Sequence, residues 1–184
     1  MRIISGIHKG RRIQAPKKLP IRPTTDMAKE ALFNILRNLV HLHGLKVLEL
    51  FAGSGNMSYE FASRGVGSVL AVDSHMPCIQ FIEKTAELLD LPIETTKADV
   101  FMFIQNHKGS YDIIFADPPY GIELEEFLKI PDAVFENNLL NTDGILIIEH
   151  SKHTDLSSHP SFDNQRKYGG TVFSFFLGES SEEE

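Results

Sequence analysis

The sequence has little cysteine, no tryptophan and no long apolar run. Its 184 residues include a single cysteine, which excludes an intrachain disulfide and favours a reducing compartment. We recognise no run of about 18 apolar residues and no signal peptide, so we expect a cytoplasmic protein with no membrane partner. A chain of this length buries roughly 70% of its unfolded surface, so it needs neither disulfides nor metal to fold.

Acidic residues are scarce in the first quarter of the chain. Residues 1–46 hold ten lysines and arginines against two acidic residues, whereas residues 47–184 hold eight against 23. The net charge of −7 therefore conceals a basic N-terminal segment on an acidic remainder. This asymmetry is expected of a protein that binds an anionic polymer at one end. A basic segment that only aids solubility explains the composition equally well.

The first 24 residues predict a small β arm. Residues 2–5 and 11–14 are rich in β-favouring side chains and are separated by glycines, and prolines follow them. Thr25 or Asp26 then caps a predicted helix, in which apolar residues from Met27 to Leu39 recur at helical spacing. The chain accordingly divides into a basic arm (1–24), a main domain (25–178) and an acidic, disordered tail (179–184).

Strands and helices alternate from residue 46 onward. The predicted strands cover residues 47–51, 68–72, 93–97, 111–116 and 144–149, the helices residues 56–64, 74–90, 100–106 and 123–137, and a β-hairpin residues 162–177. This alternation predicts an α/β fold with a mostly parallel sheet and helices on both faces. Ligands of such sheets bind beyond the carboxyl ends of the strands.

Two glycines and two acidic residues mark a candidate nucleotide site. Gly53 and Gly55 follow the first strand, where glycine lets the backbone turn tightly and approach a ligand. Asp73 ends the next strand, where a carboxylate accepts hydrogen bonds from ribose hydroxyls. A dinucleotide-binding loop would have a third glycine where Ser58 stands. Glu49, inside the first strand, suits a ligand with an ammonium group, such as S-adenosylmethionine, better than a pyrophosphate.

The loop Asp117-Pro118-Pro119-Tyr120 follows the fourth predicted strand directly. Two prolines fix φ twice and remove two amide donors, so the loop is stiff and presents acceptor carbonyls. A carboxylate followed by a rigid carbonyl can hold the hydrogens of a planar amine, which leaves the nitrogen lone pair directed at a methyl donor. The Tyr120 ring offers a face for a base turned out of its helix. The loop therefore predicts methyl transfer to an exocyclic amine.

Three further features admit simpler explanations. Asp99 ends the third strand, where it either accepts a hydrogen bond from an adenine amine or caps the next helix. Pro77-Cys78 matches the dipeptide of cytosine-C5 methyltransferases, but it falls in a predicted helix, so we expect a buried thiol. The eight histidines lack zinc-ligand spacing, so we expect no metal.

Several motifs occur in the order found in one bacterial family. They are residues 2–6, 10–12, 19–26, 30–34, 51–55 and 117–120. Over about residues 1–177 the chain resembles the 16S rRNA guanine-N2 methyltransferase family RsmD. The glycine-rich and Asp-Pro-Pro-Tyr motifs are common to many class I amino-methyltransferases. The segment Arg22–Asp26 and the basic arm distinguish the RsmD family from other class I amino-methyltransferases.

The resemblance implies a Rossmann-like class I methyltransferase with a seven-stranded sheet. It implies S-adenosylmethionine as donor and the N2 amine of a guanine as acceptor, in 16S rRNA or a partly assembled small subunit. We expect the enzyme to be a monomer. The implied donor contacts are Glu49, Phe51, Gly53, Gly55, Asp73 on the ribose, and Asp99 with Val100 at the adenine. The implied catalytic residues are Asp117, Pro118, Pro119 and Tyr120.

The basic arm is expected to contact the RNA. Phosphate contacts, which set register rather than sequence, are predicted for Lys9, Arg11, Arg12, Lys17 and Lys18. An ordinary basic surface is the simpler explanation of these five residues. The resemblance implies that Arg22, Thr24 and Thr25 line the mouth between the arm and the main domain.

Two positions depart from the family pattern, and other functions compete. Asn56 and Ser58 stand where the family often has a small apolar residue and a glycine, so we expect altered helix packing near the donor. An adenine-N6 DNA methyltransferase and a protein glutamine methyltransferase would use the same amine-holding loop. Glu49 and Ser58 argue against a nicotinamide-dependent oxidoreductase. The intact loop at Asp117 argues against a catalytically silent RNA-binding protein.

Overall fold

The computed structural model describes residues 1–22 and 24–180. Within this part of the chain the helices are α1 (Asp26–Leu39), α2 (Asn56–Ser63), α3 (Met76–Leu88), α4 (Val100–Asn106) and α5 (Leu124–Glu136). The strands are β1 (Lys46–Leu50), β2 (Ser68–Asp73), β3 (Ile93–Lys97), β4 (Tyr111–Ala116), β5 (Leu140–Ser151), β6 (Phe162–Tyr168) and β7 (Thr171–Leu177). The predicted order of strands and helices is confirmed.

Two element boundaries differ from the prediction. Helix α3 begins at Met76, and His75 rather than Ser74 occupies its N-cap position. Strand β5 begins at Leu140, four residues before the predicted start, because Leu140 already pairs with Tyr111 of β4 ahead of a register shift. The local sequence around Gly144 does not reveal this early pairing, which depends on a distant strand.

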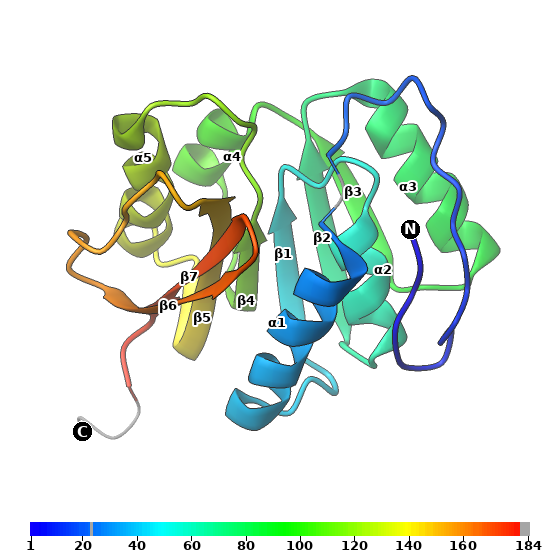
Figure 1. Ribbon diagram of the computed structural model, residues 1–184, viewed down its shortest axis with the longest axis horizontal. Coiled ribbons are helices and arrows are strands. Elements are labelled where there is room, and N and C mark those ends of the chain that lie inside the picture. The colour runs from blue at the N-terminus through cyan, green and yellow to red at the C-terminus, as the bar shows by residue number, and fades with distance from the viewer. Residues whose placement is uncertain (23, 181–184) are drawn as a thin grey trace.

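The seven strands form one sheet in the order β3-β2-β1-β4-β5-β7-β6 (Figure 1). Neighbouring strands from β3 to β5 pair in parallel, and β7 runs antiparallel to both of its neighbours. The mostly parallel seven-stranded sheet is therefore confirmed. The chain moves outward from β1 to β3 on one side and returns to β4 on the other, so the ends of β1 and β4 form the topological switch point where ligands bind.

Apolar side chains cover both faces of the sheet. Val47 of β1 packs in one cluster with residues of α1, α2 and α3, whereas Leu48 and Leu50 pack in a second with α4 and α5. This alternation follows from the pleat of a strand, in which successive side chains point to opposite faces. Figure 1 shows the two groups of helices on either side of the sheet. No helix in the described part of the chain is long and apolar enough to cross a membrane.

The basic arm lies against the main domain as a short antiparallel hairpin, in which Arg2 pairs with Arg12 and the Ile3 amide donates to the Arg11 carbonyl at 2.9 Å. Ile3 is 1% exposed and belongs to the core cluster on the α1 face. The backbone amides of Ile4 and Ser5 donate to the Glu60 carboxylate at 2.9 and 3.1 Å. A buried carboxylate thus binds the amides of the arm just beyond the paired residues. In Figure 1 the arm runs beside α2 and α3 before it reaches α1.

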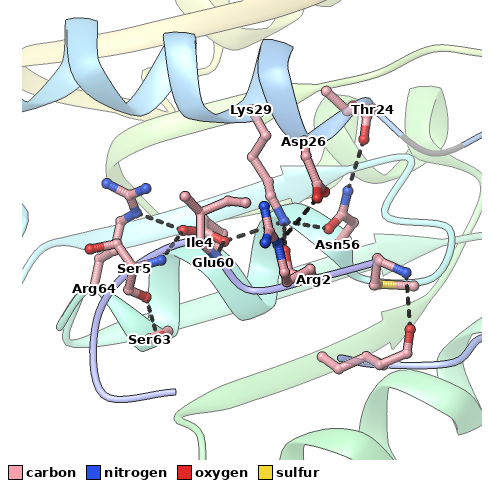
Figure 2. A network of polar contacts seen from close by, with 12 residues as sticks. Arg2, Ile4, Ser5, Thr24, Asp26, Lys29, Asn56, Glu60, Ser63 and Arg64 are labelled. Carbon is pink, nitrogen blue, oxygen red and sulfur yellow. Dashed lines mark hydrogen bonds and ion pairs between the residues drawn. The ribbon is translucent and has the colours of Figure 1, made fainter. Parts of the chain in front are cut away.

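A buried ammonium group joins the arm, α1 and α2 (Figure 2). The side chain of Lys29 is fully buried, and its Nζ donates to the Arg2 carbonyl at 2.6 Å and to Asn56 Oδ1 at 2.8 Å. The same Nζ lies 3.3 Å from Glu60 Oε2, and Arg64 Nε donates to the other carboxylate oxygen at 2.8 Å. Burial lowers the pKa of Lys29, and the Glu60 carboxylate opposes that shift. Lys29 was not expected in the interior.

The C-terminal end is attached to the sheet as far as Glu179. The Glu179 carbonyl accepts a hydrogen bond from the Asp143 amide at 2.9 Å. The expected acidic tail (179–184) therefore begins with an anchored residue, and residues 181–184 lie outside the described part of the chain.

Replacing Lys29 with alanine should lower the free energy of unfolding by about 3–5 kcal/mol, because Glu60 would lose its buried counter-ion. Denaturant unfolding at neutral pH measures this change. Lys84→Ala, on the exposed side of α3, is the matched control and should change stability by less than about 0.5 kcal/mol. Equal stabilities of the two variants would contradict a structural role for Lys29.

Candidate active site

A cavity of about 450 Å³ opens at the carboxyl ends of β1 to β4. The predicted site residues that line it are Arg22, Thr24, Glu49, Phe51, Gly53, Asp73, Asp99, Val100, Asp117, Pro118, Pro119 and Tyr120. These residues come from the arm and from the ends of four strands, which parallel pairing brings to one edge of the sheet. Gly55, Thr25, Lys9, Arg11 and Arg12 do not line this cavity.

The turn after β1 takes an unusual backbone path. Phe51, Gly53 and Gly55 all have left-handed φ values, at 59°, 56° and 81°. A non-glycine residue in this region costs of order 1–3 kcal/mol, and such strain tends to occur at functional sites. Gly55 points away from the cavity, where an added Cβ would come within 2.9 Å of Tyr59 and Ile82. Gly55 therefore shapes the turn and its packing, and Gly53 lies at the cavity wall.

Glu49 is a buried carboxylate, 3% exposed, at the floor of the cavity. The Ser58 backbone amide donates to its Oε2 at 2.8 Å, and the Ser58 hydroxyl donates to the same oxygen. Burial raises the pKa of Glu49 to about 8, and the two hydrogen bonds from Ser58 oppose that rise. Ser58, noted in the sequence as a departure, thus orients Glu49. A cation placed beside this carboxylate would restore its charge.

Asp73 and Asp99 hold the ends of β2 and β3 to the helices that follow. The two carboxylate oxygens of Asp73 accept hydrogen bonds from the Gly53 amide at 2.9 Å and from the His75 amide at 2.8 Å. Asp99 Oδ1 accepts from the Met102 amide at 3.0 Å, so Asp99 is the N-cap of α4. It also lines the cavity, so capping and the predicted adenine contact are compatible.

The catalytic loop predicted from the sequence leaves β4 beside the end of β1. The Asp117 amide donates to the Leu50 carbonyl at 3.3 Å, which fixes the start of the loop. Burial raises the pKa of Asp117 well above its usual value, nearby Glu149 raises it further, and Arg22 opposes the shift. Tyr120, by contrast, is 58% exposed. The Arg22 guanidinium lies 3.5 Å from the centre of the Tyr120 ring and covers one of its faces.

Glu149 is a site residue that the sequence analysis missed. It is 4% exposed and lies near the end of β5, and the Thr24 hydroxyl donates to its Oε2 at 2.7 Å. With Arg22, Asp117 and Tyr120 it lines a second cavity of about 50 Å³ next to the first. An acidic residue near the end of a buried strand, in the position that Asp73 and Asp117 take, was the available signal.

The arm residues fall into two groups. Thr25 caps α1, because its Oγ1 accepts a hydrogen bond from the Ala28 amide at 3.2 Å. Lys9, Arg11 and Arg12 are exposed near the turn of the arm. That turn contacts the far end of α2, where the Ile7 amide donates to the Ser63 carbonyl at 2.8 Å. Lys9, in this turn, therefore lies toward the opposite end of α2 from the cavity, whereas Arg12 pairs with Arg2, whose carbonyl accepts a hydrogen bond from Lys29.

The single cysteine takes no part in this site. Cys78 is 1% exposed in α3, as expected of a buried thiol. Burial raises the pKa of the Cys78 thiol to about 11, so almost none of it is ionised at neutral pH. The thiolate is the nucleophilic form, and Cys78 does not line the cavity, so its position argues against a cysteine nucleophile.

A family model described as "Conserved hypothetical protein 95" matches residues 1–177. The chain belongs to this family of RsmD-type methyltransferases. A Bacillus subtilis relative, "Putative rRNA methyltransferase YlbH", is 33% identical over 165 residues, which cover 85% of each chain. "Ribosomal RNA small subunit methyltransferase D" of Haemophilus influenzae is 29% identical over 163 residues, which cover 85% of this chain and 81% of the relative. The family predicted from the sequence motifs is thereby confirmed.

Solved structures share the fold. That of yhhF from Escherichia coli superposes with a TM-score of 0.85 at 23% identity and covers 98% of this chain and 99% of its own. RsmC of Thermus thermophilus, a 16S rRNA N2 methyltransferase in complex with S-adenosylmethionine and guanosine, has a TM-score of 0.69 at 18% identity. That match covers 88% of this chain and 45% of RsmC. The class I methyltransferase fold is confirmed.

The cofactor of this enzyme is S-adenosylmethionine, as predicted from the sequence. The residues that line the larger cavity fit it. Glu49 is a buried carboxylate where the ammonium group of the donor needs a counter-ion, and Gly53 leaves the cavity wall without a side chain. Asp73 is 9% exposed at the end of β2, where ribose hydroxyls would lie.

Donor binding at pH 6.5 should release about one proton, because Glu49 with a pKa near 8 is protonated in the free protein and ionises beside the donor ammonium group. Titration calorimetry in buffers of different ionisation enthalpy measures that proton. Glu49→Gln should bind the donor more weakly and release none. Glu94→Gln, on exposed β3, should behave like the unmodified protein. Binding without proton release by the unmodified protein would show that Glu49 does not meet the ammonium group.

Proposed function

We propose that this enzyme methylates the exocyclic N2 amine of a guanine in 16S rRNA. The observation that carries the proposal is the position of the Asp117–Tyr120 loop, which lines both the donor cavity and the smaller cavity beside it. The curated relatives named as rRNA methyltransferases support an rRNA substrate. The substrate is either 16S rRNA itself or a partly assembled small subunit.

Asp117 and Pro118 act together on the target amine in this proposal. The Asp117 carboxylate and the Pro118 carbonyl accept the two amine hydrogens, which directs the nitrogen lone pair at the donor. S-adenosylmethionine supplies an electrophilic methyl group on its sulfur. The nitrogen–carbon bond forms as the sulfur–carbon bond breaks with its electron pair going to sulfur, and the amine loses one proton. Asp117 is suited to take that proton, because its raised pKa makes it a stronger base than an exposed carboxylate.

Tyr120 and Arg22 form the entrance for the base. The exposed Tyr120 ring is placed to stack on a base turned out of its helix, which is worth about 1–3 kcal/mol per base. The Arg22 guanidinium now covers a face of that ring. A base that stacks on this face displaces Arg22, and a phosphate of the same RNA is the group that a displaced guanidinium binds well.

The basic arm (1–24) holds the RNA backbone in this proposal, and residues 25–178 carry out the reaction. Lys17 and Lys18 are exposed next to Pro20 and Ile21, which line the donor cavity. Arg11 and Arg12 are exposed on the segment of the arm where Arg12 pairs with Arg2. An RNA that reaches both pairs follows residues 11–18 of the arm.

Asp117→Ala should lower the rate of methyl transfer by about 10²–10⁴-fold while S-adenosylmethionine binding largely survives, because Asp117 holds the amine rather than the donor. The readout is mass spectrometry of rRNA from cells that lack the gene and carry each variant, which scores one N2-methylguanine. Asp163→Ala, an exposed carboxylate on β6 outside both cavities, is the matched control and should restore full methylation. Full methylation by Asp117→Ala would disprove the proposed catalytic loop.

Neutralising Arg11 and Arg12 together, or Lys17 and Lys18 together, should each weaken RNA binding. Each pair should also reduce the slope of log K against log salt by about 1–2, because fewer counterions are released. Filter binding over a range of salt concentrations measures the slope. The control replaces Arg37 and Lys84, which are exposed on α1 and α3. If one of the two double substitutions leaves the salt slope unaltered, that pair of residues does not contact the RNA.

A further inference from the structure

Two carboxylates stand side by side at the ends of adjacent strands. The register of β4 and β5 pairs Ala116 with Ile148, so the next residues, Asp117 and Glu149, lie level with each other. Neighbouring strands are about 4.8 Å apart, and both residues line the smaller cavity. The proposed reaction uses one of these carboxylates to hold the amine. It leaves the second without an assigned task.

Glu149 is oriented through one of its two oxygens. The Thr24 hydroxyl donates to Oε2 at 2.7 Å, and no hydrogen bond to Oε1 is found among the described residues. Glu149 lines the smaller cavity, so Oε1 is the oxygen that remains to accept a hydrogen bond from a ligand there. Burial raises the pKa of Glu149, whereas the Thr24 hydroxyl and the Arg22 guanidinium favour its ionised, hydrogen-bond-accepting form.

The Watson–Crick edge of guanine differs from that of the other amine-bearing bases. In adenine and cytosine, the ring nitrogen beside the exocyclic amine is a hydrogen-bond acceptor. In guanine, the N2 amine stands beside N1–H, which is a donor. Enzymes that turn out a base read it by hydrogen bonds to this edge. A carboxylate placed beside the amine-holding group accepts N1–H of guanine and repels the ring nitrogen of the other two.

We propose that Glu149 accepts a hydrogen bond from N1–H of the target guanine while Asp117 and Pro118 hold its N2 amine. Glu149 is then the residue that selects guanine over other amine-bearing bases, and Thr24 is the positioning residue that holds its carboxylate. This inference rests on the proposed methylation of guanine N2. It adds to that function a physical reason why the site rejects adenine.

The test replaces the target guanine of 16S rRNA with 2-aminopurine by ligation, within reconstituted small subunits. 2-Aminopurine keeps the amine at the same ring position but presents an acceptor at N1. The unmodified enzyme should methylate the guanine substrate with a kcat/KM at least about tenfold higher, because an acceptor facing Glu149 leaves the carboxylate unpaired. Equal kcat/KM values for the two substrates would overturn the inference without any variant.

The Glu149→Gln variant gives a second measurement. An amide both donates and accepts, so it can bind either ring nitrogen. In this variant the ratio of kcat/KM for guanine to kcat/KM for 2-aminopurine should therefore fall about fivefold or more. The comparison between enzymes cancels any intrinsic difference in reactivity between the two bases. Glu136→Gln makes the same chemical change at an exposed position of α5, outside both cavities. It should keep the preference of the unmodified enzyme for guanine. An unchanged preference in Glu149→Gln would also overturn the inference.

A third variant covers the case in which Glu149→Gln does not fold. Thr24→Val keeps the Glu149 carboxylate and removes the hydroxyl that holds it. The ratio of kcat/KM for guanine to kcat/KM for 2-aminopurine should fall less than in Glu149→Gln, with near-normal donor binding. A preference in Thr24→Val equal to that of the unmodified enzyme would remove Thr24 from the mechanism. Failure of the unmodified enzyme to form N2-methylguanine in the unaltered subunits is a separate result, which would overturn the proposed function itself.

Discussion

The buried ion pair between Lys29 and Glu60 is the interaction on which the geometry of this active site depends. It joins α1 to α2, and both partners also bind the backbone of the arm. Asn56, which receives a hydrogen bond from Lys29, donates to the Thr24 carbonyl at 3.4 Å (Figure 2). The Thr24 hydroxyl in turn reaches Glu149 at the end of β5. One buried charge pair thus connects the arm to the side of the cavity where the target base is expected.

Local patterns in the sequence were sufficient for the strand order along the chain, the turn after β1 and the loop at Asp117. Features that depend on contacts between distant segments were not predictable. Helical spacing placed Met27 with the apolar residues of α1, whereas it is 71% exposed and its neighbour Lys29 is buried. A lysine is normally assigned to solvent, and only Glu60, about thirty positions later, makes its burial favourable. Glu149 had a local signal, its place near the end of a buried strand, but its orientation depends on Thr24, which is 125 residues away.

The two cavities share one electrostatic character. Glu49, Asp117 and Glu149 are carboxylates whose pKa values are all raised by burial. Within the described residues, Arg22 and Lys29 are the positive charges that oppose this rise. Such groups are costly to ionise without a partner, and they favour ligands that bring N–H donors or positive charge. The donor ammonium group and the base amine are both ligands of this kind. The basic arm supplies the opposite character where the RNA backbone is expected.

Because Arg22 lies over Tyr120, a base must displace this arginine to stack on that face of the ring. A ring that already carries a guanidinium at 3.5 Å has no free platform on that side, so a base gains only the difference between two stacking interactions. A free guanine nucleobase offers nothing to the displaced arginine. A guanine within a polynucleotide brings neighbouring phosphates, which can bind the displaced Arg22 guanidinium. In the proposed function, this exchange favours a guanine within a polynucleotide over a free guanine.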